Sequence, residues 1–303
     1  MGVRKTYFLD MHCDTLTERG KLVNEYNFSN LAGQLQVFAA FVPNRARAPE
    51  VRRAELMFYA RRYKRACEWE GLYEVKSKSD LKKAKETGER AAIFAVEGGG
   101  GLFAPSWELE ALYAMGLRIL GLAWDDNELS GSSGSERGLT AYGRELVIRA
   151  AKMGIIIDIS HLSDRAAEEV LEICPTPPIA THSNFREVCP ARRNLPLHIA
   201  RGIAERGGVI GLNLYPPFLN ESGSAGWADI LRHIDYALGN FGEGVLGLGL
   251  DIDGTGGVYP RGFSEGESIH DAVYDVLIKH YPSSVAEGII GGWAVNFLSR
   301  TLP

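Results

Sequence analysis

Eight short apolar runs, with few polar interruptions, are the feature that most restricts how this chain can fold. Parallel strands that are buried on both faces have this continuous pattern, whereas strands with one solvated face alternate between apolar and polar residues. The runs therefore predict parallel strands that are covered on both sides. They are Tyr7–Asp14, Leu35–Val42, Ala91–Glu97, Arg118–Trp124, Ile155–His161, Pro178–His182, Gly208–Tyr215 and Val245–Asp251.

Helical segments separate most of these runs, and several begin and end at typical capping residues. One begins at Ser79 and ends at Gly88, and another begins at Ser163. Because strands and helices alternate without a break in composition, we expect one α/β domain over residues 1–303, folded as a (β/α)8 TIM barrel. The expected helices are Pro49–Glu70, Ser79–Gly88, Ser106–Met115, Thr140–Met153, Ser163–Ile173, Pro196–Arg206, Trp227–Phe241, Ser268–His280 and Ser283–Ser299.

Composition argues against a nucleic-acid or membrane partner. The 303 residues are 45% hydrophobic and 23% charged, and the net charge is −5. The most basic run, 61–65, is flanked by apolar residues, so we interpret it as the polar face of a helix. No apolar stretch reaches the ~20 residues of a membrane-spanning helix. The four cysteines are scattered, and we expect reduced thiols in a cytoplasmic protein.

Ionisable residues follow the apolar runs at the end where a barrel of this kind places its active site. His12 and Asp14 are two residues apart in the first run, so their side chains share one face of a strand. Charged groups after long apolar runs are costly unless they are paired or bind a metal. We therefore predict one site at this end of the barrel. The further residues at strand ends are Glu97, His161, His182, Asp251 and Asp253.

Each of these residues, taken alone, has an ordinary structural explanation. A lone histidine at a strand end is usually a hydrogen-bonded residue, Glu97 before two glycines could cap a helix, and Asp251 could form an Asx turn. Three histidines together with these carboxylates, on five strand ends, favour a metal site instead. Their nitrogen and oxygen ligands suit Zn²⁺, and leave Mn²⁺, Fe²⁺ and Co²⁺ open.

The number of ligands favours two ions rather than one. A catalytic zinc takes three protein ligands and a water, so five ligands fit two ions that share a bridging carboxylate. Ions about 3.5–4 Å apart would lower the pKa of a bridging water and polarise a substrate carbonyl. The predicted chemistry is hydrolysis, with Asp251 moving the proton. We expect the Ser- and Gly-rich stretch 127–138 to form a mobile loop beside this site.

Seven motifs, in order along nearly the whole chain, resemble those of the membrane (renal) dipeptidases, zinc peptidases with a barrel of the metal-dependent hydrolase type. The resemblance implies that His12 and Asp14 hold one zinc, that His161 and His182 hold the second, and that Glu97 bridges both. The motifs lie at Asp10–Thr15, Glu97–Gly99, Gly138–Gly143, Asp158–His161, His182–Asn184, Ala191–Asn194 and Gly249–Gly254.

The resemblance also implies roles for two residues outside the metal ligands. Asp251 would act as general base and acid, and Arg193 would bind the C-terminal carboxylate of a dipeptide, which suits the planar guanidinium. The alternative for Arg193 is a surface arginine in a basic turn with Arg192. By resemblance, a C-terminal D-residue is tolerated and a homodimer is plausible.

One position departs from the family pattern. Where well-known mammalian members carry a substrate-contacting histidine after the fourth strand, this chain has Trp124. An indole donates one hydrogen bond but cannot carry a proton between groups. Trp124 would instead form a pocket wall, and Asp125, Asp126 or Asn127 could supply a polar contact. Two alternatives therefore stay open: a metal-dependent amidohydrolase acting on another amide or a lactam, and a metal-stabilised barrel that binds a ligand without turnover.

Overall fold

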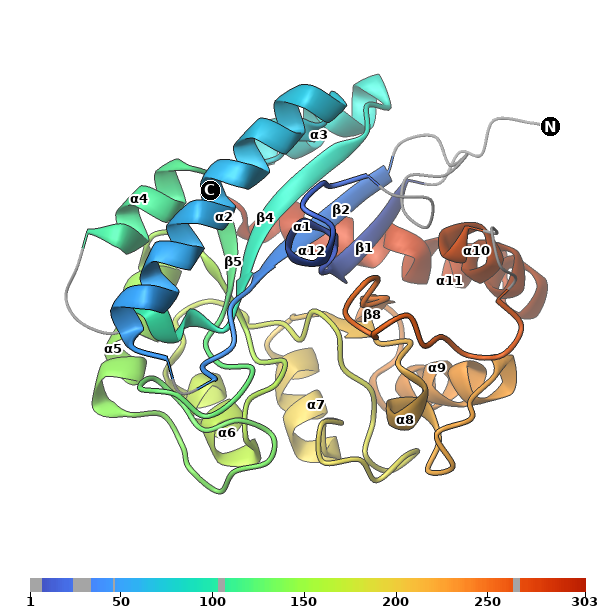
Figure 1. The fold of residues 1–303 in the computed structure, drawn as a ribbon. Coiled ribbons are helices and arrows are strands. Elements are labelled where there is room, and N and C mark those ends of the chain that lie inside the picture. The colour runs from blue at the N-terminus through green and yellow to red at the C-terminus, as the bar shows by residue number, and fades with distance from the viewer. Residues whose placement is uncertain (1–6, 24–33, 46, 103–106, 264–267) are drawn as a thin grey trace.

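A curved sheet of parallel strands forms the centre of the fold (Figure 1). The computed structural model describes residues 7–23, 34–45, 47–102, 107–263 and 268–303. Neighbouring strands follow the order β6-β5-β4-β2-β1-β8-β7, and the two-residue strand β3 (Tyr73–Glu74) pairs with β4. The main strands are β1 (Phe8–Cys13), β2 (Gln34–Phe41), β4 (Ala91–Glu97), β5 (Leu117–Gly121), β6 (Ile156–Asp158), β7 (Ile210–Leu212) and β8 (Leu246–Leu248).

The gap between β6 and β7 is filled by the predicted sixth strand, which pairs through single bridges. Asp158 pairs with Ile179 and Ala180 pairs with Ile210, both in the parallel sense. The backbone nitrogen of Ile159 donates to Ile179, and that of Gly211 donates to Ala180, each at 2.8 Å. Pro177 and Pro178 have no N–H, which prevents a longer ladder here. With this segment the circle is complete, and the predicted TIM-barrel-like α/β fold is confirmed.

Several strands end earlier than the apolar runs predicted. The run that continues to His161 leaves the sheet after Asp158, and the run that continues to Asp251 leaves it after Leu248. His161 has a φ of 67° and Asp251 a φ of 60°, values outside the β region. Both residues therefore lie on loops that follow the strands, whereas His12 and Glu97 lie within β1 and β4.

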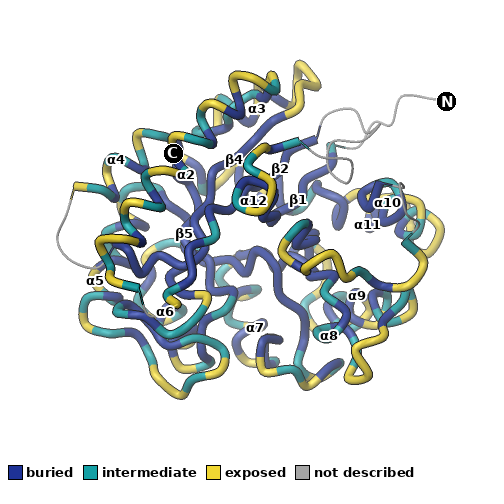
Figure 2. Tube along the Cα trace, in the orientation of Figure 1, coloured by how far each residue is buried: buried dark blue, intermediate teal, exposed yellow. Residues whose placement is uncertain are grey.

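Helices surround the sheet and expose only their outer faces, while the strands are buried (Figures 1 and 2). The predicted capping residues Thr140 and Ser163 accept hydrogen bonds from backbone nitrogens three residues later. Ser106, the predicted start of another helix, lies outside the described residues. No helix in the described ranges has the length and apolar character needed to cross a membrane. The helices are α1 (Thr15–Glu18), α2 (Pro49–Glu70), α3 (Lys78–Thr87), α4 (Glu108–Ala114), α5 (Ala141–Lys152), α6 (Asp164–Ile173), α7 (Leu197–Glu205), α8 (Pro216–Leu219), α9 (Trp227–Phe241) and α10 (Ile269–His280).

The last predicted helix, Ser283–Ser299, is interrupted. It divides into α11 (Ser283–Glu287), a π-helical turn (Gly288–Gly292) and α12 (Trp293–Thr301). A Cβ atom on Gly291 would lie 2.3 Å from the carbonyl oxygen of Tyr7, so glycine allows the turn to approach β1 closely. The apolar face of α12 packs in one core cluster with the inward-facing residues Leu9, Val37 and Ile93. The C-terminal helix thereby covers the end of the barrel opposite the site.

Candidate metal centre

A β-bulge in β1 separates His12 from Asp10, which a regular strand would place on the same face. The register of β1 against β2 shifts between Asp10 and Cys13. Asp10 turns toward β8, where its Oδ1 accepts hydrogen bonds from the backbone nitrogens of Leu250, at 2.9 Å, and of His12, at 3.3 Å. His12 and Asp14 face the candidate site together, as their spacing predicted.

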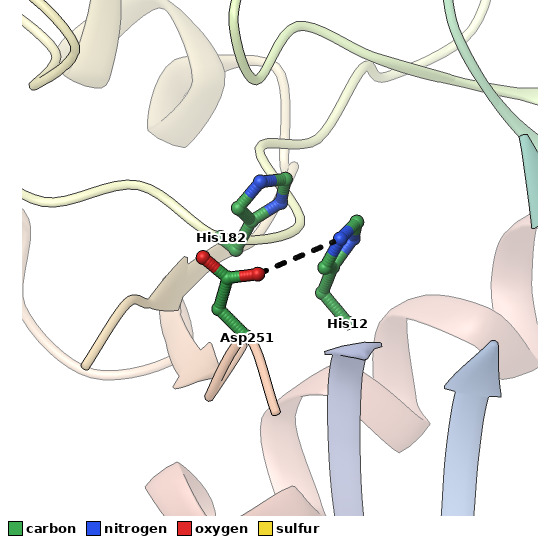
Figure 3. Close-up of side chains that lie close together, drawn as sticks. All are labelled: His12, His182 and Asp251. Carbon is green, nitrogen blue, oxygen red and sulfur yellow. Dashed lines mark ion pairs between the residues drawn. The ribbon is translucent and has the colours of Figure 1, made fainter. Parts of the chain in front are cut away.

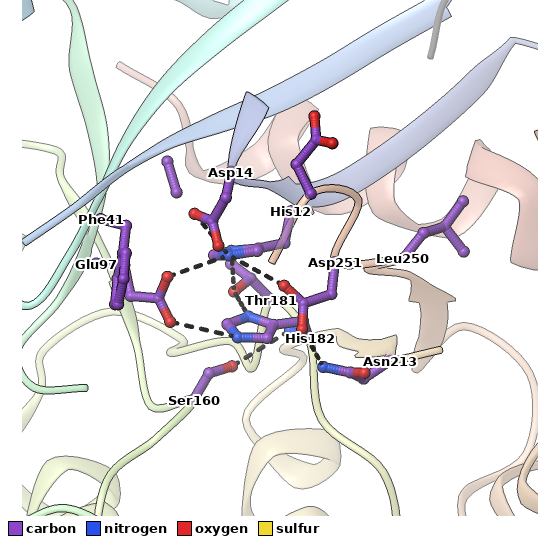
Figure 4. A network of polar contacts seen from close by, with 12 residues as sticks. His12, Asp14, Phe41, Glu97, Ser160, Thr181, His182, Asn213, Leu250 and Asp251 are labelled. Atoms are coloured by element: carbon purple, nitrogen blue, oxygen red, sulfur yellow. Dashed lines mark hydrogen bonds and ion pairs between the residues drawn. The ribbon is translucent and has the colours of Figure 1, made fainter. Parts of the chain in front are cut away.

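Glu97, the last residue of β4, faces His12 and His182 (Figure 4), and it also contacts His161. Its Oε2 is 3.3 Å from Nε2 of His12. Its Oε1 is 2.7 Å from Nε2 of His161 and 3.5 Å from Nε2 of His182. The carboxylate thus presents one oxygen to β1 and the other to the loops that follow β6 and the predicted sixth strand.

Six of the seven predicted residues converge into three overlapping groups of potential metal ligands. In each group the ligand atoms lie within 4.8 Å of one another. Asp251 approaches His12 in one of them, with 3.9 Å between Oδ1 and Nε2 (Figure 3). Asp253 belongs to none of the groups, and its Oδ1 accepts a hydrogen bond from Arg19 at 3.0 Å. The groups are His12, Asp14 and Glu97; Glu97, His161 and His182; and His12, His182 and Asp251.

Unsatisfied buried atoms in this cluster fit a divalent cation. Nε2 of His12 and Oδ1 of Asp14 are buried and have no hydrogen-bond partner among the described residues. Nε2 of His161 and Nε2 of His182 face each other at 2.9 Å. Imidazole nitrogens and carboxylate oxygens that converge without partners are what Zn²⁺ and related ions require. The residues present therefore fit the predicted metal.

The electrostatics of the cluster arise from burying many ionisable groups together. Burial disfavours the charged form of His12, but the nearby carboxylates, chiefly Glu97, raise its pKa to about 10. Burial lowers the pKa of His161 to about 4 and also lowers that of His182. Burial and the charge of Glu97 raise the pKa of Asp14. A cation in the cluster would favour ionised carboxylates and neutral imidazoles, the forms that bind metals.

Asp251 has one carboxylate oxygen held by the protein and one directed at the cluster. Its Oδ2 accepts a hydrogen bond of 3.0 Å from Nδ2 of Asn213, a fully buried residue after β7. Burial raises the pKa of Asp251, and the charge of Glu97 adds to this effect. Sequence reasoning did not single out Asn213, although an amide within an apolar run was a usable signal.

A cavity of about 710 Å³ opens beside the cluster and is lined by Glu97, His161 and Asp251. Arg193 also lines it, is only 7% exposed, and donates hydrogen bonds of 2.8 Å to Ser183 and to the carbonyl of His182. Its Nε is buried without a hydrogen-bond partner among the described residues. The surface-arginine explanation therefore does not apply to Arg193. Aromatic side chains form the cavity's apolar walls: Phe41, Trp124, Tyr215 and Phe218.

Trp124 forms part of one cavity wall and is 40% exposed. Its ring packs edge-on against Phe41, with centroids 5.2 Å apart. The three polar residues that follow it are engaged elsewhere. Asp125 accepts hydrogen bonds from the backbone nitrogens of Asn44 and Arg45, and Asp126 and Asn127 hold the 127–138 loop through backbone contacts. The loop lies beside the site, as expected, and its mobility stays a prediction.

Nearly the whole chain matches one family of known proteins. The model of the membrane dipeptidase family, peptidase family M19, matches residues 3–300. A Klebsiella pneumoniae protein described as an uncharacterized protein in the pqqA 5′ region is 33% identical over 191 residues, which cover 59% of this chain and 70% of that protein. Dipeptidase 3 of Mus musculus is 26% identical over 68% of this chain, but the match spans only 43% of that longer protein.

Solved structures share the fold over almost the whole chain. A dipeptidase described as a metallopeptidase of family M19 has a TM-score of 0.85 and 23% identity, and the match covers 99% of both chains. A metallopeptidase from Rhodobacter sphaeroides, solved with a phosphinate mimic of the dipeptide L-Ala-D-Ala, has a TM-score of 0.83 and 23% identity, with 98% of this chain and 99% of that chain covered.

Proposed function

Because this chain belongs to the membrane dipeptidase family, we propose that it hydrolyses the peptide bond of dipeptides at a centre of two zinc ions. The observation that carries the proposal is the position of Glu97. Its two oxygens face separate groups of ligands, at the edge of a cavity that also contains a buried arginine. A carboxylate with one oxygen toward each group is suited to bridging two ions.

The ligands divide between the two proposed ions by their contacts. His12 and Asp14 would hold one ion, His161 and His182 would hold the other, and Glu97 would contribute to both. Two bound zinc ions supply an activated water and an electrophile for the substrate carbonyl. The chain itself must then bind the dipeptide, orient it and move protons.

Asp251 and Arg193 are the residues proposed for these tasks. Asn213 holds Oδ2 of Asp251, which leaves Oδ1 directed at the cluster to accept a proton and return it to the leaving amine. The unpartnered Nε of Arg193, beside the cavity, would donate to the substrate's C-terminal carboxylate. Burial strengthens this contact because water competes less for the carboxylate.

We extend the proposal to dipeptides with a C-terminal D-residue. The Rhodobacter sphaeroides enzyme was solved with a mimic of L-Ala-D-Ala, which supports this choice of substrate. The cavity of about 710 Å³ has room for a dipeptide in either configuration.

A second candidate activity follows from Trp124. It forms an apolar wall and cannot carry a proton, so the substrate-contacting histidine of mammalian members has no equivalent at this position. Another amide, such as an N-acyl amino acid or a lactam, is the alternative substrate class. Such a substrate would use the same metals and would depend less on a carboxylate contact to Arg193.

The proposed function is tested with zinc-loaded protein and a panel of L-L and L-D dipeptides. We expect release of free amino acids that a chelator abolishes, and loss of both bound zinc and activity in Glu97→Ala. Glu136→Ala, at an exposed surface residue, is the matched control. Absence of cleavage with two zinc ions bound would favour the second substrate class, and full activity in Glu97→Ala would overturn the proposal.

A further inference from the structure

Thr181 joins one histidine from each of the two proposed zinc sites (Figure 4). Its Oγ1 lies 2.8 Å from Nδ1 of His182 and 3.3 Å from Nδ1 of His12. The two rings stack with centroids 3.7 Å apart, and all three residues are at most 1% exposed. A single hydroxyl therefore contacts the inner nitrogen of both rings, away from water.

The hydroxyl proton of Thr181 is committed to a third group. Oγ1 lies 2.5 Å from Oδ2 of Asp158, whose other oxygen accepts two backbone hydrogen bonds of 2.9 Å, from Ser160 and Thr181. Asp158 thus acts as an acceptor on both oxygens. Since a threonine hydroxyl has one proton and two lone pairs, Thr181 donates to Asp158 and can only accept from the two rings.

We infer that Thr181 is a positioning residue that fixes His12 and His182 with a proton on Nδ1, so that both Nε2 atoms are directed at the proposed zinc ions. The opposite tautomer would require Thr181 to donate to a ring and leave an oxygen of the buried Asp158 without its partner. Partners of this kind determine which imidazole nitrogen is free to bind a metal. The inference rests on the proposed metal centre. It adds that one side chain orients a histidine ligand of each of the two zinc ions.

The consequence is that a change at Thr181 affects both ions. In Thr181→Val the side chain keeps its shape but cannot accept, so Nδ1–H of both rings loses its partner. We expect zinc affinity to fall about 10- to 100-fold. In Thr181→Ser the hydroxyl is retained, and affinity is expected to stay within a few-fold of the unmodified protein. A residue that only filled space would give the opposite order, with valine tolerated better than serine.

The decisive measurement is ¹⁵N NMR of the histidine rings in zinc-free protein, combined with zinc competition against a chelator. Nδ1 of His12 and of His182 should both carry a proton, and Thr181→Val should redistribute the proton of His182 while Thr181→Ser preserves it. His233, whose ring contacts the backbone of Phe185 and of Leu219 and not Thr181, is the internal control.

The outcomes separate this inference from the proposed function. A proton on Nε2 of His182 in the unmodified protein would overturn the inference, even if Thr181→Val did not fold. Unchanged tautomers and zinc affinity in a folded Thr181→Val protein would do the same. The NMR measurement needs no turnover, so a protein with the expected tautomers and no dipeptidase activity would contradict only the proposed function.

Discussion

Arg192 and Arg193 are neighbours in the sequence and both line the cavity, but they differ in exposure and in their partners. The side chain of Arg192 is 68% exposed and pairs with Glu136, whereas Arg193 is buried at the cavity. Substitution of Arg192 is therefore a matched control for substitution of Arg193, the residue proposed to bind the substrate carboxylate. The two arginines have the same charge and lie nearly equally far along the chain from His182.

Arg193→Ala should raise KM for dipeptides about 10- to 100-fold, since hydrogen bonds to charged groups contribute about 1.5–3 kcal/mol. We expect kcat to change less, because the carboxylate is bound before and during the reaction. Steady-state kinetics on one dipeptide measures both values. Arg192→Ala should leave KM within about two-fold, and equal effects of the two substitutions, at full zinc content, would refute the assignment.

Trp124→Ala should leave the zinc content unchanged, because the indole supplies no ligand to the cluster. We expect a loss of stability of about 0.5–1.5 kcal/mol from the edge contact with Phe41, and a higher KM for dipeptides with large apolar side chains. Metal analysis and a substrate series measure these effects. Loss of zinc in this variant would show that Trp124 orders the centre rather than the pocket wall.

At the residue scale, the sequence predicted the groups that form the cluster but not those that orient them. His12, Glu97 and Asp251 stand out because an ionisable group after an apolar run is costly to bury unless it is paired or binds a metal. Thr181 and Asn213 have uncharged side chains that are compatible with a strand, so their contacts depend on how the strands pair. The roles of all these residues stay predictions.

At the scale of elements, the positions of the barrel strands were predictable but their ends were not, and the two-residue strand β3 was not predicted. The apolar pattern continues beyond the hydrogen-bonded ladder because residues after the strands are buried as well. The left-handed backbone of His161 and Asp251 and the bulge in β1 have no counterpart in the pattern of apolar residues. These deviations direct side chains into the site, as is common where a fold carries function.

His233 in α9 shows how an element is held by a buried neutral imidazole. Its Nδ1 accepts from the backbone nitrogen of Phe185, at 3.3 Å, and its Nε2 donates to the carbonyl of Leu219, at 3.2 Å. The helix thus holds the loop that contains Phe185 and the short helix α8, whose Phe218 lines the cavity. Burial lowers the pKa of His233 to about 4, so the folded protein keeps this ring neutral at pH values where an unfolded chain protonates it.

Stability should therefore decrease as the pH falls from about 6.5 to about 4, because the unfolded state gains a proton that the folded state lacks. We expect a contribution of about 3 kcal/mol, fully present above pH 6.5. Denaturant unfolding of zinc-free protein at several pH values measures it. His233→Gln has no titrating group at this position and should lose correspondingly less stability on acidification; identical pH dependence in both proteins would rule the mechanism out.

On the scale of the whole molecule, the barrel and the centre are linked, because the proposed ligands come from β1, β4 and three loops. Ligands that bind only the folded state raise its stability, by about 2.7 kcal/mol per site at a hundred-fold excess over Kd. We expect zinc removal to lower Tm by at least about 5 °C. Thermal unfolding with and without a chelator measures this, and Glu97→Ala should show little response to the chelator.

The first and last strands meet beside this centre. Cys13 bridges to Ile252, the backbone nitrogen of Asp14 donates to Ile252 at 2.8 Å, and Asp10 accepts from Leu250. During synthesis, residue 12 leaves the ribosome long before residue 251 exists, so the early histidine spends most of translation without the strand that fixes it. We therefore expect the proposed zinc ions to bind most tightly after the ring of strands has closed, so that zinc occupancy in cells would report completed folding.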